Sequence, residues 1–437
     1  MAYITRTTGN PMTNQKKFTY SAWLKITDLG TYQRPIQNYY DGNNRGYILF
    51  CSSSDSAANT FFLYDKEGGT INYQANTTAK FRDTNAWYHI VYRVDSTQAT
   101  QSDRVRFYVN GEQQSLSIST NVGQNVNMGF NSAGANLRIG GTESGSEPWK
   151  GVMSHVHFCD GYSYGPDSFG STDSTTGEWK INTTPSVTYG NNGFWVFKND
   201  AAVTDRSGEG NNFTLSGSIT PTVDNPSNNF ATMNPLYTFD SALAYTKGNT
   251  VVAYSGSGAD SWTTRYAISS LGMRSGKYYA ETKIAAIGTN QMYVMGIISD
   301  PSANAVNSSI GYLSNAYAYY TADGRIIAGA SDLQTGIGTA TTNDIVGLAF
   351  DADNGTMQLY KNGSAIGSQV TGISVGDRTW HFASNFYSTG KIAWNFGNGY
   401  FEETAVSSAG TNASNIGIFE YDVPSGYTAL RTKGLNE

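Results

Sequence analysis

Hydrophobic and polar residues alternate along two neighbouring segments in the first half of the chain. Residues 88–94 are mostly bulky β-forming side chains separated by polar ones, and residues 104–109 alternate charged and bulky side chains. This two-residue period is typical of strands that bury one face. Asn110 and Gly111 follow directly, and this dipeptide adopts the positive φ angles of a tight turn. Residues 87–111 therefore predict two strands joined by a polar loop and closed by an Asn-Gly turn.

The second half of the chain repeats this construction. Residues 345–351 form an apolar run that ends in aspartate, residues 356–360 form a run that contains a tyrosine, and Asn362-Gly363 closes the unit. We interpret the repeat as two β-sandwich domains, each built around one central hairpin.

Turn-forming residues separate the other strand-like segments at intervals of about ten residues, the spacing expected of a β-sandwich. No segment keeps the 3.6-residue period of an amphipathic helix, so we predict very little helix, with one short helical turn within residues 165–170. The predicted fold class is all-β, with two tandem antiparallel β-sandwiches.

Length and composition bound the number of domains and the kinds of partner. The chain has 437 residues, enough for two ordinary domains, and its 48 glycines and 30 tyrosines are typical of a turn-rich β protein with ample apolar area to bury. The formal net charge of −6 argues against a nucleic-acid partner, which requires a basic surface. No apolar run reaches the roughly 18 residues of a membrane span, so we expect no membrane insertion. Only 14% of residues are charged, and we expect a homo-oligomer.

Residues 1–217 carry a first family resemblance. The segments that carry it are FTYSAWLKI, AWYHIVYRVD, DRVRFYVNGEQ, LRIGG and GVMSHVHFCDG. In order and spacing they resemble a laminin-G-like, concanavalin A-like jelly roll. The segment DRSGEGNNF at residues 205–213 is similar to a signature that follows this jelly roll in virion proteins of tailed phages. The resemblance implies a jelly-roll domain over residues 1–217 and a phage origin.

Residues 250–400 carry a second resemblance, within a predicted second domain of residues 249–437. The segments GKYYAE, MGI, YYTADGRI, NDIVGLAFDADNGTMQLYKNGSAIG and NFG resemble the strand landmarks of a SPRY domain, in order. The resemblance implies a SPRY-like β-sandwich, and the C-terminal tail is similar to the closing segment of phage proteins with this domain. Residues 218–248 form a connector that is rich in proline and asparagine pairs. Because it also contains Phe230, Met233 and Leu236, we expect it to be packed.

The concanavalin A-like resemblance raises the question of catalysis, because this fold includes glycanases. Such enzymes need two carboxylates that flank the scissile bond. Glu402 and Glu403 are adjacent, which puts them on opposite faces of a strand, and we interpret them as a solvated pair. Asp95 and Asp351 each end a predicted strand and are interpreted as turn formers. We therefore predict that the protein is not an enzyme.

Two sets of residues raise the question of metals and thiols. His155, His157 and Cys159 share one face of a predicted strand, which allows either a zinc site or ordinary packing, and we favour packing. Cys51 and Cys159 each end an apolar run, and we favour two buried free thiols over a disulfide.

An oxygen-rich turn at residues 41–44 is the candidate cation site. Asp41 and Asn43 are the residues that would bind calcium there, and a plain turn is the favoured alternative. No other cofactor is expected. Sugar sites commonly place an aromatic ring beside amide or carboxylate groups near loops. The candidate ligand-binding residues are Tyr40, Asp41, Asn43, Asn44, Trp149, Tyr317 and Tyr319, with a core or oligomer contact as the alternative for the aromatic ones.

These patterns lead to one functional prediction. We expect a non-enzymatic surface protein of a phage virion, a tail fibre, tail tip or capsid appendage, that attaches to host cell-surface glycan or protein. The N-terminal residues lack the apolar core of a secretory signal, so we expect synthesis in the host cytoplasm and release by lysis within the virion. Other virion proteins are the expected partners. A purely structural capsid decoration or assembly protein is the first alternative, and a polysaccharide-degrading enzyme of the same fold is the second.

Overall fold

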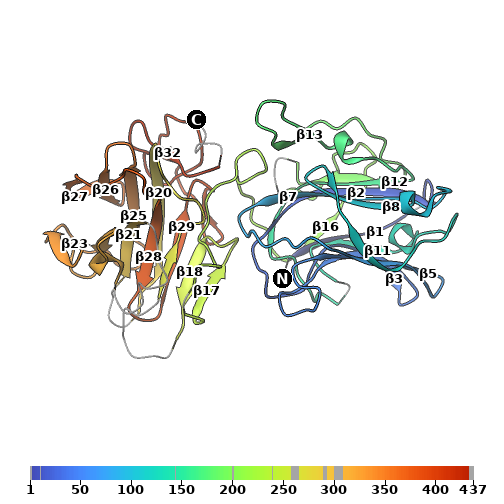
Figure 1. Ribbon diagram of the computed structural model, residues 1–437, viewed down its shortest axis with the longest axis horizontal. Helices are drawn as coiled ribbons and strands as arrows, with labels where there is room; N and C mark the ends of the chain where they lie inside the picture. Colours follow the sequence, from blue (N-terminus) through green and yellow to red (C-terminus); the bar gives the residue numbers. More distant parts are fainter. Residues whose placement is uncertain are drawn as a thin grey trace. The chain divides into compact units, whose positions relative to one another are not determined.

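The computed structural model describes residues 2–9, 11–142, 144–198, 201–238, 240–256, 265–288, 293–299 and 309–432. The described residues form β-strands and short 3-10 turns, which confirms the predicted all-β fold class. The chain divides into two compact units, Met1–Pro221 and Thr222–Glu437, and each unit is built of stacked sheets (Figure 1).

The first unit is a sandwich of an eight-stranded and a six-stranded sheet. In edge-to-edge order, the strands of the eight-stranded sheet are β10 (Leu116–Thr120), β6 (Thr70–Thr77), β5 (Phe61–Glu67), β4 (Asn44–Phe50), β3 (Gln33–Asp41), β11 (Asn136–Ile139), β1 (Tyr3–Thr7) and β16 (Thr214–Ser216). Those of the six-stranded sheet are β15 (Phe194–Val196), β12 (Gly151–Asp160), β2 (Lys17–Ile26), β7 (Trp87–Asp95), β8 (Val105–Val109) and β9 (Glu112–Gln113). The unit also contains the strand pair β13 (Gly170–Thr172) and β14 (Trp179–Ile181), and the 3-10 turns η1 (Gln101–Asp103), η2 (Gly129–Asn131) and η3 (Pro166–Ser168). The last of these turns lies where the sequence predicts one.

Aromatic side chains from facing strands fill the space between these two sheets. The ring of Phe18 on β2 lies 5.3 Å from that of Tyr92, 4.8 Å from that of Phe130 and 5.7 Å from that of Phe158, measured between centroids. All four side chains are buried. Aromatic pairs in such edge-to-face and stacked geometries stabilise a core by about 0.5–1.5 kcal/mol each beyond their buried area.

The first predicted hairpin is confirmed as β7 and β8. Asn110 has a φ angle of +49° and Gly111 one of +82°, the left-handed conformation that the Asn-Gly turn requires. The side-chain Oδ1 of Asn110 accepts a hydrogen bond from the backbone N–H of His89 at 2.8 Å, and the Asn110 N–H donates to the His89 carbonyl at 2.8 Å. The asparagine therefore joins the turn to the neighbouring strand.

The second unit is also a two-sheet sandwich. One sheet contains, in order, β17 (Leu243–Thr246), β18 (Val251–Tyr254), β29 (Gly390–Asn395), β20 (Lys277–Ala286), β25 (Ile345–Asp351), β26 (Thr356–Lys361) and β27 (Ser364–Val370), and β32 (Thr428–Ala429) pairs with β20. The other contains β19 (Tyr266–Ile268), β28 (Trp380–Phe386), β21 (Tyr293–Ser299), β22 (Ala316–Tyr320), β23 (Arg325–Ala328) and β24 (Ser331–Gln334). The unit also contains η4 (Ile310–Tyr312) and the strand pair β30 (Tyr400–Phe401) and β31 (Thr404–Ala405).

The second predicted hairpin is confirmed as β25 and β26. Asn362 and Gly363 have φ angles of +48° and +81°, within one degree of those at Asn110 and Gly111. The Oδ1 atom of Asn362 accepts a hydrogen bond from the backbone N–H of Ile345 at 2.9 Å. In both sandwiches the Asn-Gly turn has the same backbone conformation, and the asparagine side chain accepts a hydrogen bond from the first strand of the hairpin.

Residues 205–213, which carry the phage-type signature, close the first sandwich. The carboxylate of Asp205 accepts hydrogen bonds from the backbone N–H of Trp195 at 2.9 Å and from that of Asn211 at 2.8 Å. Asn211 in turn accepts a hydrogen bond from Nη2 of Arg6 at 2.6 Å. Since Arg6 lies on β1 and Trp195 on β15, this segment fastens the end of the domain to its beginning.

Part of the proposed connector contributes to the second unit. Met233 forms a bridge with Ser269, Phe230 forms one with Arg431, and β17 pairs with β18. Phe230 and Met233 are buried, whereas Leu236 is 59% exposed.

Both cysteines are buried and free. Cys51 follows β4 in the eight-stranded sheet and Cys159 lies on β12 in the six-stranded sheet. Burial raises the pKa of each thiol above its ordinary value. The favoured prediction of two buried free thiols is confirmed.

Candidate functional site

The turn between β3 and β4 holds four of the predicted ligand-binding residues. The Oδ1 atom of Asp41 accepts hydrogen bonds from the backbone N–H groups of Asn43 and Asn44, both at 2.8 Å, and from Nδ2 of Asn44 at 2.9 Å. The hydrogen bond from Asn43 is the main cause of a lowered pKa of Asp41. Tyr40 is 57% exposed. These contacts describe an Asx turn, and calcium at Asp41 and Asn43 stays a prediction.

The other predicted aromatic residues lie in different surroundings. Trp149 is half-buried against the core of the first sandwich. Tyr317 on β22 is half-buried, with its ring 5.9 Å from that of Trp380. Tyr319 requires a correction, because it is fully buried in the core and its hydroxyl donates to the Gly338 carbonyl at 2.7 Å. The structure therefore gives Tyr319 no surface to offer a ligand. Trp149 belongs to the first unit, as does the Asp41 turn, and Tyr317 and Tyr319 belong to the second.

The predicted stripe of His155, His157 and Cys159 is interrupted by a bulge. The register of β12 shifts between Ser154 and His157, and His155 has a φ angle of +47°. Nδ1 of His157 is hydrogen-bonded to the Tyr189 hydroxyl at 2.9 Å. Burial lowers the pKa of His155 to about 4 and that of His157 well below its ordinary value. Both rings are therefore neutral packing elements at neutral pH. They pack against Trp195, which belongs to the same buried cluster as Cys159.

The remaining candidate carboxylates take part in ion pairs. Glu402 pairs with Lys391 and Glu403 with Lys247, so the two adjacent glutamates contact different partners. Within the described ranges, no group of three or more His, Cys, Asp and Glu residues is placed to hold a metal ion. No helix among the described residues has the length and apolar character needed to cross a membrane.

Six side chains from six adjacent strands form a row across one face of the eight-stranded sheet. The strand register places each side chain opposite the next. In order across the sheet they are Thr5 on β1, Arg138 on β11, Gln37 on β3, Tyr47 on β4, Tyr64 on β5 and Gln74 on β6. Their chain neighbours, such as Ile48 and Leu63, lie in the core, and successive strand residues point to opposite faces. These six residues, which we call the sheet-face row, therefore lie on the face turned away from the core.

Two stacked phenol rings form the centre of the sheet-face row. The rings of Tyr47 and Tyr64 lie 4.9 Å apart with an interplanar angle of 16°, and the ring of Phe62 lies 6.1 Å from that of Tyr47. Tyr47, Phe62 and Gln74 are half-buried, whereas Tyr64 is 8% exposed and Gln37 is 2% exposed. The row thus combines aromatic rings and an amide group on a rigid sheet, which is a combination suited to sugar recognition.

Two guanidinium groups border these rings, and a third lies elsewhere in the row. The Cζ atom of Arg34 lies 3.7 Å from the ring centroid of Tyr47, and that of Arg45 lies 5.5 Å from that of Tyr64. Arg138, within the row, lies 4.6 Å from the ring of Tyr3. Arg34 also forms an ion pair with Glu147, whereas Arg45 forms no ion pair with any described residue. The face therefore combines aromatic rings with cations.

A buried carboxylate supports the row from the core side. Asp65, which follows Tyr64 on β5, accepts hydrogen bonds from the backbone N–H groups of Gly129 at 3.0 Å and Phe130 at 2.7 Å. Burial raises the pKa of Asp65 to about 7 despite these hydrogen bonds. The contact fixes η2 beneath β4 and β5 and so limits movement of the row.

Comparison with known families defines the class of the first unit. Residues 2–162 match the concanavalin A-like lectin/glucanases superfamily, through its Laminin_G_3 family. The first sandwich therefore contains a concanavalin A-like domain, as the sequence resemblance implied. No curated protein matches the chain significantly.

Solved structures similar to part of the chain include several SPRY domains. The SPRY domain of human HERC1 is 18% identical, with 37% of this chain and 96% of that domain covered and a TM-score of 0.31. The PSpry domain of TRIM65 is 9% identical, with 38% and 88% covered and a TM-score of 0.31. A human SPRY domain is 18% identical, with 35% and 94% covered and a TM-score of 0.27.

The sheet-face row was missed in the sequence because its members are scattered over six strands. Two of the strands carry a local signal, a polar residue between two core residues: Arg138 lies between Leu137 and Ile139, and Gln74 between Tyr73 and Ala75. The sequence places ligand binding at the loops, whereas the members of the row lie within strands.

Proposed function

We propose that the protein is a non-enzymatic surface component of a tailed-phage virion that attaches the particle to a glycan on the host cell. The resemblance of residues 205–213 and of the C-terminal tail to phage proteins supports the virion location. The observation that carries the attachment function is the sheet-face row, with its stacked Tyr47 and Tyr64 rings. The protein is made in the host cytoplasm, joins other virion proteins as a homo-oligomer and leaves the cell by lysis.

The chemistry of this face favours an anionic glycan. Guanidinium groups form charge-assisted hydrogen bonds with carboxylate, sulfate or phosphate groups. Arg45 and Tyr47 are half-buried, whereas Tyr64 between the two is buried, so an acidic sugar can contact the Arg45 cation and the Tyr47 ring. Gln74 supplies an amide donor and acceptor at the end of the row for uncharged sugar hydroxyls.

Calorimetric titration with an acidic polysaccharide of a bacterial envelope tests this function. A carboxyl-reduced preparation of the same polysaccharide is the matched neutral ligand. We expect saturable binding of the acidic form, and at least tenfold weaker binding by Arg45→Gln. Arg274→Gln is the control variant, because Arg274 is an exposed arginine of the second sandwich that pairs with Asp377. Equal affinity for both polysaccharides, or an unaffected Arg45→Gln variant, would contradict the proposed contact.

One observation favours a second function, which is virion assembly. β10 is an edge strand of the eight-stranded sheet and contains no charged residue, and its Ile118 side chain is 44% exposed. Edge strands of this kind can pair with another chain, since natural edges are commonly protected by lysine or proline. Images of particles would separate the two functions: copies at symmetric capsid positions favour assembly, and a few copies at the tail favour attachment.

A further inference from the structure

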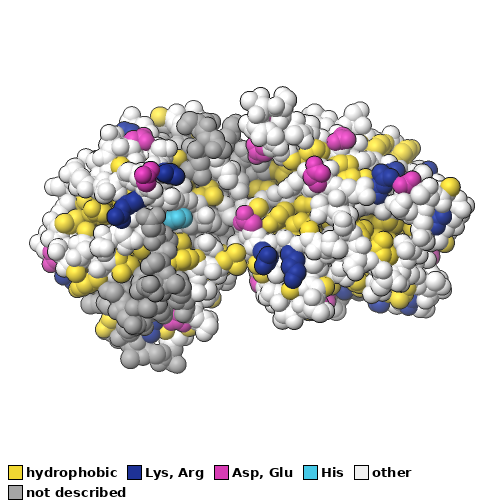
Figure 2. Space-filling model, in the orientation of Figure 1, with side chains coloured by type: hydrophobic (Ala, Val, Ile, Leu, Met, Phe, Trp, Pro, Cys, Tyr) yellow, Lys and Arg dark blue, Asp and Glu magenta, His cyan; other side chains and the backbone are white. Residues whose placement is uncertain are grey.

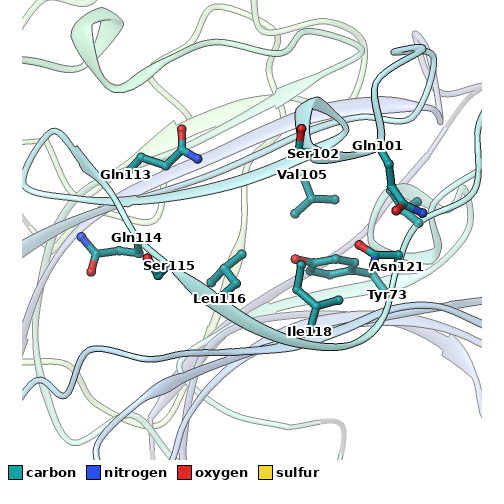
Figure 3. A pocket seen from close by; sticks show the side chains of 11 residues that line it. Tyr73, Gln101, Ser102, Val105, Gln113, Gln114, Ser115, Leu116, Ile118 and Asn121 are labelled. Carbon is teal, nitrogen blue, oxygen red and sulfur yellow. The ribbon is translucent and has the colours of Figure 1, made fainter.

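An open cavity of about 400 Å³ lies at the side of the first sandwich. Figure 3 shows it between the segment that contains Gln101 and Val105 and the segment that runs from Gln113 to Ile118. Its volume is within the range of sites for small molecules. None of its lining residues belongs to the sheet-face row.

The amide groups around this cavity have unused hydrogen-bonding capacity. Gln101, Gln113 and Asn121 line the cavity and are exposed. Across the described part of the chain, their side-chain amides form no hydrogen bond with another residue. Each amide offers two donors and an acceptor, so together they can contact several hydroxyl groups of one ligand.

The hydroxyl of Tyr73 is an unsatisfied polar group at the cavity floor. Tyr73 is 1% exposed, and its hydroxyl is buried without a hydrogen-bond partner among the described residues. Its ring lies between Ile118 and Val105 in Figure 3. Burial raises the pKa of Tyr73 well above its ordinary value, so the phenol stays protonated and keeps its donor. A buried hydroxyl without a partner is unfavourable, and a ligand hydroxyl at the floor would satisfy it.

The lining selects against charged ligands. Every residue that lines the cavity is uncharged, and Val105, Leu116 and Ile118 supply apolar contact surface. An ionised group would lose hydration here without a counter-charge from the lining, which is unfavourable. A neutral sugar ring matches both features, because its hydroxyls can pair with amides while its C–H face contacts the apolar side chains.

Arg104 holds one wall of the cavity in place. This buried side chain donates to the carbonyls of Gln98 at 2.8 Å, Ala99 at 2.9 Å and Val122 at 3.0 Å. Val122 lines the cavity, and the other two carbonyls lie just before Gln101. The wall is therefore preorganised, which reduces the entropy cost of ligand binding.

We propose that this cavity binds a neutral saccharide unit. The amides of Gln101, Gln113 and Asn121 and the hydroxyl of Tyr73 are its hydrogen-bonding partners, and Arg104 is a positioning residue. The site is separate from the sheet-face row, and the proposal does not depend on the proposed attachment function.

Titration calorimetry of the full chain with neutral gluco-, manno- and galacto-oligosaccharides tests the proposal. We expect one of the three series to bind, and Gln113→Ala and Tyr73→Phe each to weaken that binding at least tenfold. Tyr20→Phe is the matched control, because Tyr20 is likewise fully buried with an unpartnered hydroxyl but does not line the cavity. Thermal unfolding of Tyr73→Phe should occur at or above the wild-type temperature, since the variant removes an unsatisfied group.

Each alternative outcome separates this site from the sheet-face row. No binding of any neutral series, or binding that Gln113→Ala and Tyr73→Phe leave unchanged, overturns the cavity proposal. Binding of acidic polysaccharide alone, sensitive to Arg45→Gln, overturns it while supporting the attachment function. Cavity-dependent binding of a neutral oligosaccharide without any acidic-glycan binding supports the cavity and contradicts the sheet-face site.

Discussion

Lys17 and Asp95 form an ion pair, with Nζ 3.2 Å from Oδ2, at the base of the central hairpin of the first sandwich. The two residues are opposite each other in the register of β2 and β7. Lys277 and Asp351 are opposite each other in β20 and β25 and repeat the contact at 3.0 Å. The two sandwiches thus share an Asn-Gly turn after the central hairpin and an ion pair that joins the hairpin to the neighbouring strand.

Replacing the aspartate should be more harmful than replacing the lysine. Besides Lys17, Asp95 accepts hydrogen bonds from the backbone N–H of Thr97 at 3.1 Å and from Nε2 of Gln98 at 2.8 Å. We expect Asp95→Ala to lower the unfolding free energy by about 1–3 kcal/mol, and Lys17→Met, which keeps the aliphatic stem, by less than about 1 kcal/mol. Denaturant unfolding of both variants measures the difference. Equal losses would show that the ion pair, and not the turn, is the stabilising contact.

The same aspartate should contribute to acid sensitivity. Burial alone would raise the pKa of Asp95, but hydrogen bonds from Thr97 and Gln98 and the contact with Lys17 lower it below its ordinary value of 3.8. A lowered folded-state pKa gives stability that is present above the unfolded-state pKa and is lost as the pH falls. The Asp95→Ala variant should therefore lose less stability than the wild type between pH 5 and pH 3, as measured by unfolding at each pH.

Glu281 should have the opposite pH dependence. Its carboxylate accepts hydrogen bonds from the backbone N–H groups of Glu420 and Tyr421, both at 2.9 Å, and burial raises its pKa to about 7 from 4.5. Because the folded chain holds this proton to a higher pH than the unfolded chain, its contribution is fully present below about pH 4.5 and is lost as the pH rises towards 7. The stability of the second sandwich should decline over this window, and Glu281→Gln should flatten the decline. A steeper decline in the variant would refute the assignment.

Substitutions at an Asn-Gly turn should lower the unfolding free energy in a fixed order. Asn110 combines a φ angle of +49° with a side-chain hydrogen bond to His89. Glycine keeps the backbone conformation and loses the hydrogen bond, whereas alanine loses the hydrogen bond and strains the backbone. We expect Asn110→Gly to cost about 1 kcal/mol and Asn110→Ala about 2 kcal/mol of unfolding free energy. If alanine were tolerated as well as glycine, the turn conformation would not be a determinant of stability.

Residues 205–213 should stabilise the first sandwich without affecting the second. Asp205→Ala removes the acceptor for Trp195 and Asn211 and leaves one buried and one half-buried backbone donor unpaired. We expect a loss of about 3 kcal/mol, seen as a lower unfolding midpoint of the first sandwich alone. Glu209→Ala is the matched control, since Glu209 is an exposed acid in the same segment.

The sequence predicted the features that local chemistry determines. The hairpins at Asn110 and Asn362 were predictable because alternating strands and an Asn-Gly turn are read from adjacent residues. The sheet-face row was not, because it depends on the register of six strands that are far apart in the chain. Tyr319 was misjudged for a related reason: β22 is buried on both faces, so its alternation of Tyr and Ala gives no exposed side.

The charge distribution along the sequence does not predict where cations gather on the surface. Figure 2 shows mostly uncharged surface with scattered charged side chains on the face in view. The low overall charge therefore gave no indication that Arg34, Arg45 and Arg138 lie on one sheet face. Their grouping emerges only from strand order.

Hydrogen exchange with and without a saturating acidic envelope polysaccharide tests the central claim most directly. The account predicts protection of peptides that cover β4 and β5, which carry Tyr47 and Tyr64, and no change in peptides of the second sandwich. Protection confined to the second sandwich, or no protection at any peptide, would contradict the claim that the sheet-face row binds the host glycan.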